Sequence, residues 1–153
     1  MELKTQVKAG QGQQEIVISR QFDLPLELLF KAFTEADLFA QWMGTKVLKL
    51  EAQNHGSYRF ETSDPSGKVV FRANGTFHEV VLNRKIVRTF QMEGTPFPAQ
   101  LEFLEFESLS EHSSLLKMQI IFRSEAFRDQ LLQMPFASGL SMAHDRLQNL
   151  MTH

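Results

Sequence analysis

The sequence contains no cysteine, which excludes a disulfide framework, a thiolate metal site and a cysteine nucleophile. No stretch approaches the run of about 18 apolar residues that a membrane-spanning helix requires, and residues 1–14 lack the apolar core of a signal peptide. Neither sign of charge dominates: 16 Lys and Arg are spread among 18 Asp and Glu, a net charge of −2. Because no basic stripe exists, nucleic acid and acidic membrane surfaces are not expected as partners. The lack of cysteine, of a signal peptide and of a membrane span leads us to expect a cytoplasmic protein.

The usual catalytic signatures are also missing. The sequence has no glycine-rich phosphate loop, no Gly-x-Ser-x-Gly and no His-Glu-x-x-His. Its five histidines are scattered without the spacing of metal ligands. We therefore expect no metal, no cofactor and no recognisable catalytic constellation.

Large apolar side chains without a polar group are abundant. The chain has 14 Phe and seven Met against one Tyr and one Trp. Phe supplies much apolar surface, and Met adapts to irregular gaps. This composition fits either a tightly packed core or a core that encloses a lined cavity.

One domain is expected, because 153 residues is close to the usual size of a single hydrophobic core. The Gln- and Gly-rich stretch within residues 1–14 predicts a mobile lead-in, with structure beginning at Glu15 and one domain over 15–153. Residues 15–22 alternate as a strand does. Asp23 is placed to cap a short helix with Pro25 in its first turn, and a second short helix over 36–42 is expected to end at Gly44.

Strand patterns separated by turn signals then follow one another along the chain. They cover residues 46–52, 57–62, 68–81, 85–92, 99–109 and 115–122. Asn74-Gly75 alone would indicate a hairpin turn that divides the third of these strands, and the alternative is a glycine bulge within one long strand. Residues 125–151 carry a helical period with Ser124 as a candidate cap, and Pro135 predicts a break near Met134.

The order of these elements predicts an α+β fold of the helix-grip kind. Hairpin-linked strands form an antiparallel sheet with one buried face, and only the last helix is long enough to cover that face. A curved antiparallel sheet would then wrap a long C-terminal helix, with two short helices after the first strand. The space between helix and sheet is the candidate site.

Several ordered segments resemble the activator of Hsp90 ATPase homologue type of START-like domain, within the superfamily that includes polyketide cyclases and Bet v 1 allergens. They are RQFDLP (20–25) with Glu27, LFKAFT (29–34), LFAQWMG (38–44), HGSYRF (55–60), GTFHEV (75–80), Gly139 and Arg146-Leu147. In that family the glycine before the Phe-x-Glu segment lies within a strand, so the bulge is preferred at Gly75. The chain departs from the family where His55-Gly56 replaces a Gly-Gly pair, where Met43 replaces a Trp, and where Glu51 or Gln53 replaces an Asp.

The resemblance leaves three functions open. A small-molecule-binding protein with an enclosed hydrophobic cavity, for a lipid- or polyketide-like apolar ligand, ranks first because the chain offers apolar volume and few catalytic groups. A cofactor-free enzyme of polyketide cyclase type ranks second. A domain that interacts with an Hsp90-type chaperone ranks third, and a homodimer is compatible with each.

We expect the ligand-binding residues to be apolar side chains of the inner face together with two polar ones. They are Trp42, Tyr58, Phe60, Arg88, Phe90, Met118, Ile120, Met134, Leu140 and His144. Arg88 shares a strand face with Ile86 and Phe90, and an inward arginine needs a carboxylate or an anionic ligand. Arg20, Arg88 and His144 are each expected either at the rim, against a structural partner, or facing the cavity.

Overall fold

The computed structural model describes residues 3–152 and begins with a short strand, β1 (Gln6–Lys8), which pairs antiparallel with β2 (Glu15–Phe22). The expectation that structure begins at Glu15 is therefore wrong. Val7 is the only apolar residue of β1, so three residues carry no periodic signal in the sequence. Residues 1 and 2 of the expected lead-in lie outside the described residues, and the mobility of this segment stays a prediction.

Two short helices, α1 (Leu26–Thr34) and α2 (Ala36–Met43), follow β2. Pro25 occupies the N-cap of α1, and its carbonyl accepts from the N–H groups of Leu28 and Leu29, each at 3.1 Å. Asp23 is not the cap that the sequence predicted, because the helix begins at Leu26 with Pro25 as its N-cap and no side chain makes a capping hydrogen bond. Helix α2 ends as predicted at Gly44, whose φ of 64° is a conformation that glycine adopts without strain.

The remaining strands complete one eight-stranded sheet in which every neighbouring pair is antiparallel. The order across the sheet is β1-β2-β8-β7-β6-β5-β4-β3. The strands not yet named are β3 (Lys46–Leu50), β4 (Ser57–Ser63), β5 (Val69–Val81), β6 (Lys85–Met92), β7 (Gln100–Ser110) and β8 (Ser113–Ile121).

Strand β5 runs without interruption through Gly75, so the hairpin alternative is excluded. The register shift lies between Phe77 and Glu79 rather than at Gly75 itself. Gly75 is needed for a different reason, because a Cβ there would lie 2.0 Å from the Thr89 carbonyl oxygen and 2.5 Å from the Tyr58 ring. The glycine thus makes room for a tyrosine that belongs to the site.

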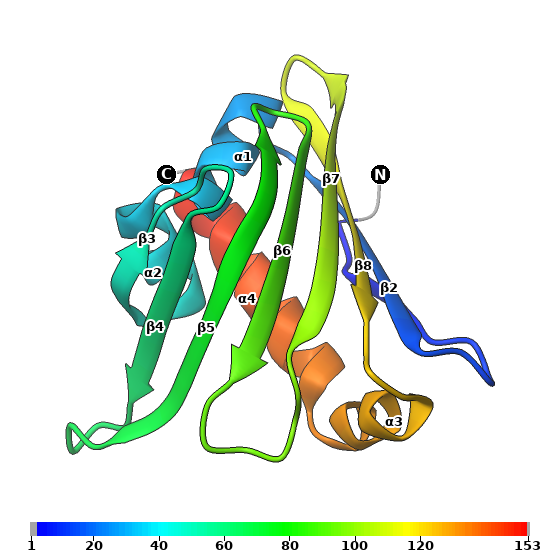
Figure 1. Ribbon diagram of the computed structural model, residues 1–153. Helices are drawn as coiled ribbons and strands as arrows, with labels where there is room; N and C mark the ends of the chain where they lie inside the picture. Colours follow the sequence, from blue (N-terminus) through cyan, green and yellow to red (C-terminus); the bar gives the residue numbers. More distant parts are fainter. Residues whose placement is uncertain (1–2, 153) are drawn as a thin grey trace.

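The C-terminal segment forms α3 (Glu125–Gln133) and α4 (Phe136–Met151), separated by an extended residue at Met134 and by Pro135. Ser124 caps α3 as predicted, since its hydroxyl accepts from the N–H of Phe127 at 3.2 Å. Helix α4 crosses one face of the curved sheet, and α1 and α2 lie at one end of that face (Figure 1). This arrangement confirms the predicted helix-grip architecture.

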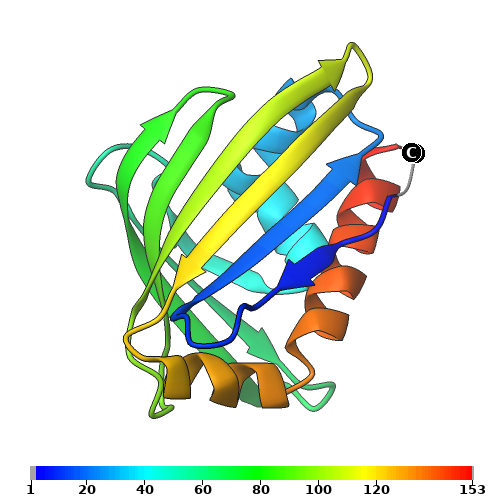
Figure 2. The same cartoon turned by 90° about the vertical axis from the view of Figure 1, so that its right-hand side faces the viewer.

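Side-chain contacts fix α4 against the rest of the fold. Nε of Arg146 donates to the Trp42 carbonyl at 3.0 Å, which joins α4 to α2. Gln148 hydrogen-bonds the backbone of Asp23, and Arg20 of β2 pairs with Asp145 at 2.8 Å. Figure 2 shows β1 lying between β2 and α4, so the N-terminal strand flanks the same helix.

Candidate functional site

A cavity of about 160 Å³ lies between α4, α2 and the inner face of the sheet. Its walls are mostly aromatic and aliphatic. Apart from Tyr58 and Trp42, four buried lining residues carry polar groups, namely Arg88, Gln100, Glu102 and His144. The lining residues are Ile18, Phe33, Phe39, Trp42, Met43, Tyr58, Phe60, Arg88, Phe90, Gln100, Glu102, Met118, Ile120, Phe136, Leu140 and His144. The cavity is smaller than the roughly 300 to 1,000 Å³ common for small-molecule pockets.

The structure brings nine of the ten predicted site residues to this cavity. The residue it leaves out is Met134, whose side chain is 48% exposed. Because the backbone is extended at Met134, this side chain leaves the apolar stripe that continues through Leu140 of α4. The helical period that suggested it does not extend across the break at Pro135.

The sequence analysis did not name seven of the lining residues, and the two polar ones among them are Gln100 and Glu102 of β7. Strand β7 carries apolar residues on both faces, with Leu101 and Phe103 on one and Leu104 on the other. Strand alternation alone therefore did not decide which set faces inward. The signal available was Glu102 lying two residues from Leu104, which makes the acidic side chain part of the buried set.

Aromatic rings form the wall below α2. Trp42 lies 5.0 Å from Phe33 and 5.6 Å from Phe39, measured between ring centroids, and Phe39 lies 5.3 Å from Phe60. The indole N–H of Trp42 donates to the Ala32 carbonyl at 2.7 Å. With its polar group satisfied by backbone, the tryptophan presents apolar surface to the cavity.

Tyr58 forms the wall on the β4 side. Its hydroxyl donates to the Thr89 carbonyl at 2.6 Å, and its ring lies against Gly75. Burial raises the pKa of Tyr58 above its ordinary value, so the phenol stays protonated at physiological pH. Tyr58 therefore contributes a fixed, uncharged surface.

A buried ion pair supplies most of the polarity. Nε of Arg88 donates to Oε1 of Glu102 at 2.9 Å, and Nε2 of Gln100 donates to Oε2 of Glu102 at 2.8 Å. The side chains of Arg88 and Glu102 are 9% and 4% exposed. Burial disfavours the guanidinium charge, but Tyr58 and Glu102 more than compensate, so the pKa of Arg88 lies above its ordinary value. The carboxylate that an inward arginine requires is Glu102.

The terminal nitrogens of Arg88 make no hydrogen bond to the described residues. Among residues 3–152, the hydrogen bond of Arg88 uses Nε alone. No fully buried side-chain nitrogen or oxygen of the described chain lacks a partner, so these terminal nitrogens keep accessible surface. Since Arg88 lines the cavity, their N–H groups can donate to an occupant.

His144 lines the cavity from α4. Its Nδ1 is 2.8 Å from the Thr5 hydroxyl, just before β1, and its ring packs edge-on against Phe22 at 5.6 Å. Burial, with the Arg20 guanidinium adding to it, lowers the pKa of His144 to about 4. The imidazole is therefore neutral at physiological pH.

Arg20 lies outside the cavity. It is buried and pairs with Asp145, and its guanidinium carbon lies 5.1 Å from the centroid of the Phe22 ring. Of the three polar residues considered for the interior, Arg88 and His144 line the cavity, whereas Arg20 has a structural partner.

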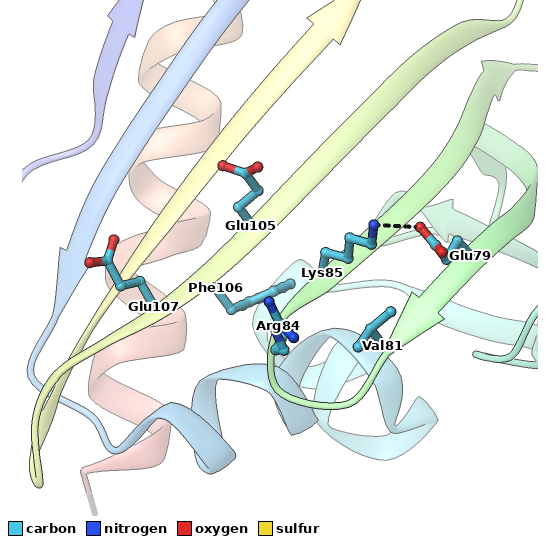
Figure 3. Close-up of a pocket in the computed structure, with 7 residues that line it drawn as sticks. All are labelled: Glu79, Val81, Arg84, Lys85, Glu105, Phe106 and Glu107. Atoms are coloured by element: carbon cyan, nitrogen blue, oxygen red, sulfur yellow. Dashed lines mark ion pairs between the residues drawn. The ribbon is translucent and has the colours of Figure 1, made fainter.

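A larger hollow of about 430 Å³ lies outside the sheet, near the β5–β6 turn and the adjoining part of β7 (Figure 3). Its residues are Glu79, Val81, Arg84, Lys85, Glu105, Phe106 and Glu107. Most of their side chains are charged and exposed, and Lys85 pairs with Glu79 at 2.7 Å. We take the smaller inner cavity as the candidate site, because its mostly apolar walls between helix and sheet can shield a ligand from water.

Within residues 3–152, no group of three or more His, Asp or Glu side chains could hold a metal ion. In the same part of the chain, no helix is long and apolar enough to cross a membrane.

Solved structures share this architecture. A protein from Rhodobacter sphaeroides matches with a TM-score of 0.86 and 17% identity over 97% of this chain and 99% of that one. A protein from Mycobacterium smegmatis matches with a TM-score of 0.85 and 15% identity, over 97% and 96% of the two chains. One from Chromobacterium violaceum has a TM-score of 0.73 and 22% identity, over 90% and 96%. At these identities the likeness shows the fold alone.

The sequence itself identifies the family. No curated protein is significantly similar to this chain. Residues 23–152, which span both short helices, strands β3 to β8 and the C-terminal helices, match the family described as Activator of Hsp90 ATPase homolog 1-like protein. The chain therefore belongs to the Activator of Hsp90 ATPase homolog 1-like family and has its START-like, Bet v 1-like helix-grip fold.

Proposed function

We propose that the protein binds a small apolar molecule in the cavity between α4 and the sheet. The observation that carries this proposal is a mostly apolar cavity whose lining includes Arg88, a residue with N–H groups that no described residue engages. The terminal N–H groups of Arg88 make no hydrogen bond to the described residues and keep accessible surface, so they are available to an acceptor in an otherwise mostly apolar wall. A ligand with an apolar body and one acceptor would match both features of these walls.

The volume sets the size of the ligand. An apolar cavity of about 150 Å³ engineered in another protein binds benzene, and the cavity here has about 160 Å³. A compound with one aromatic ring and a short substituent fits this space. A longer lipid- or polyketide-like ligand requires Phe136 or Leu140, both only partly buried, to move aside.

The state of His144 favours binding over acid–base catalysis. A general base works best when its pKa is near the working pH. With a pKa of about 4, the imidazole of His144 is a weak base at neutral pH. It can still donate or accept a hydrogen bond, which suits the orientation of a ligand.

Isothermal titration calorimetry with isopropylbenzene tests the proposal on three proteins. Wild type is expected to bind one equivalent. Leu140→Trp adds bulk to the cavity wall and is expected to lower the affinity at least tenfold, whereas Met142→Trp, two residues along the same helix and 61% exposed, leaves it unchanged. Wild-type protein that takes up no ligand, or equal affinity in all three, would exclude the cavity as a binding site.

A further inference from the structure

The polarity of the cavity is set by two opposite charges rather than one. Arg88 alone would make the interior an anion site, but Glu102 contacts it at 2.9 Å. Gln100 holds the second carboxylate oxygen at 2.8 Å, so both oxygens of Glu102 are engaged within the protein. The pair is electrically neutral as a unit.

Neutrality of the pair changes which ligand the cavity accepts. A carboxylate that enters would be attracted by Arg88 and repelled by Glu102 over similar distances, so little attraction remains to offset its loss of hydration. An uncharged carbonyl gives up far less hydration and still accepts from the terminal N–H groups of Arg88. The geometry thus favours an acceptor without charge.

We infer that Glu102 makes the cavity selective for uncharged carbonyl compounds of single-ring size and against carboxylates of the same shape. The inference rests on the proposed function and adds the chemical class of the ligand. Glu102 acts here as a specificity-determining residue, because it fixes the net charge that a ligand meets. Arg88 supplies the hydrogen bond that separates a ketone from a hydrocarbon.

Three compounds of nearly identical shape separate the contributions at neutral pH: acetophenone, isopropylbenzene and benzoate. Calorimetry on the wild-type protein is expected to show acetophenone binding roughly tenfold tighter than isopropylbenzene, with benzoate weaker than both. Benzoate binding tightest would overturn the inference, since Arg88 would then act as a net cation. Equal affinity for acetophenone and isopropylbenzene would also overturn it while leaving the proposed function intact.

Binding by none of the three compounds would instead contradict the proposed function, and the inference would fall with it. This outcome is distinct from the two preceding ones, because those require measurable uptake of at least one compound. The two proposals therefore fail in different ways in the same experiment.

The variant Glu102→Gln tests the role of the carboxylate directly. Removing its charge leaves Arg88 as an uncompensated cation, so the ratio of benzoate to acetophenone affinity is expected to rise at least tenfold. Glu105→Gln removes an exposed carboxylate from the same strand and is expected to leave the ratio unchanged. An unchanged ratio in folded Glu102→Gln protein would refute the inference, and the wild-type series remains decisive if that variant does not fold.

Discussion

Replacing the two members of the buried ion pair, separately and together, is expected to give strongly non-additive losses of stability. Arg88→Met removes the cation and leaves Glu102, 4% exposed, with Gln100 as its hydrogen-bond donor. Glu102→Met leaves Arg88 as a buried cation without its carboxylate. Each single variant keeps most of the side-chain volume, so charge rather than packing is the main change.

The magnitude follows from burial and distance. Two charges about 4 Å apart attract by about 4 kcal/mol at an effective dielectric constant of about 20. Breaking a buried pair by removing one partner typically costs about 3 to 5 kcal/mol, whereas replacing both by apolar residues is often neutral or stabilising. We therefore expect the free energy of unfolding to fall by about 3 to 5 kcal/mol in each single variant and to stay within about 1 kcal/mol of the wild-type value in the double variant.

Urea denaturation of the four proteins measures this cycle, with the denaturant slope as a check that the unfolded states are comparable. The cycle is expected to give a coupling free energy of at least about 4 kcal/mol. Two single losses below about 1 kcal/mol that add up in the double variant would show that Arg88 and Glu102 do not act as a buried pair. Arg88 and Glu102 would then not present a neutral pair to a ligand.

Three further predictions concern stability. The pKa of His144 is about 4 in the folded protein against an ordinary 6.5, so its stabilising contribution is complete above about pH 6.5 and is lost as the pH falls towards 4. Over that pH range the free energy of unfolding of His144→Gln should therefore fall by about 3 kcal/mol less than that of wild type. The control variant His112→Gln, at an exposed position, should lose as much stability as wild type. Gly75→Ala should destabilise the protein by about 1 to 3 kcal/mol, because the added Cβ would lie 2.0 Å from a carbonyl oxygen. Gly139→Ala, in α4 with open space around it, should stabilise the protein by about 0.5 to 1 kcal/mol. Thermal melts that rank these two variants the other way would contradict the packing described. Ser124→Ala should lower the free energy of unfolding by about 1 kcal/mol, because it removes the N-cap hydrogen bond of α3. An unchanged melting temperature would show that this hydrogen bond does not stabilise the protein.

The fold could be predicted from the sequence because its elements carry strong local signals. Alternation marks β2 and β6 residue by residue, and Ser124 and Pro135 mark the start of α3 and the break after it. Gly44 ends α2 for the conformational reason expected of it. These features depend on neighbours a few residues away, which a single sequence displays.

The parts of the site that escaped prediction depend on distant partners. Glu102 belongs to a strand with apolar residues on both faces, and its inward position is fixed by pairing with Arg88 across the sheet. Asp23 was expected to cap a helix, but α1 begins two residues later than that role requires, with Pro25 as its N-cap, and the Asp23 backbone instead bonds Gln148, far along the chain. Cavity volume follows from how all these side chains pack, so composition could suggest a cavity and not its size.

Methyl-detected NMR on protein labelled at Ile, Leu and Met methyl groups tests the central claim most directly. Titration with acetophenone is expected to shift the methyl signals of Ile18, Met118 and Leu140, which line the cavity, and to leave those of Leu82 and Met142, which are 75% and 61% exposed, unchanged. Shifts confined to the exposed methyl groups, or no shifts at any concentration reached, would contradict a ligand-binding interior.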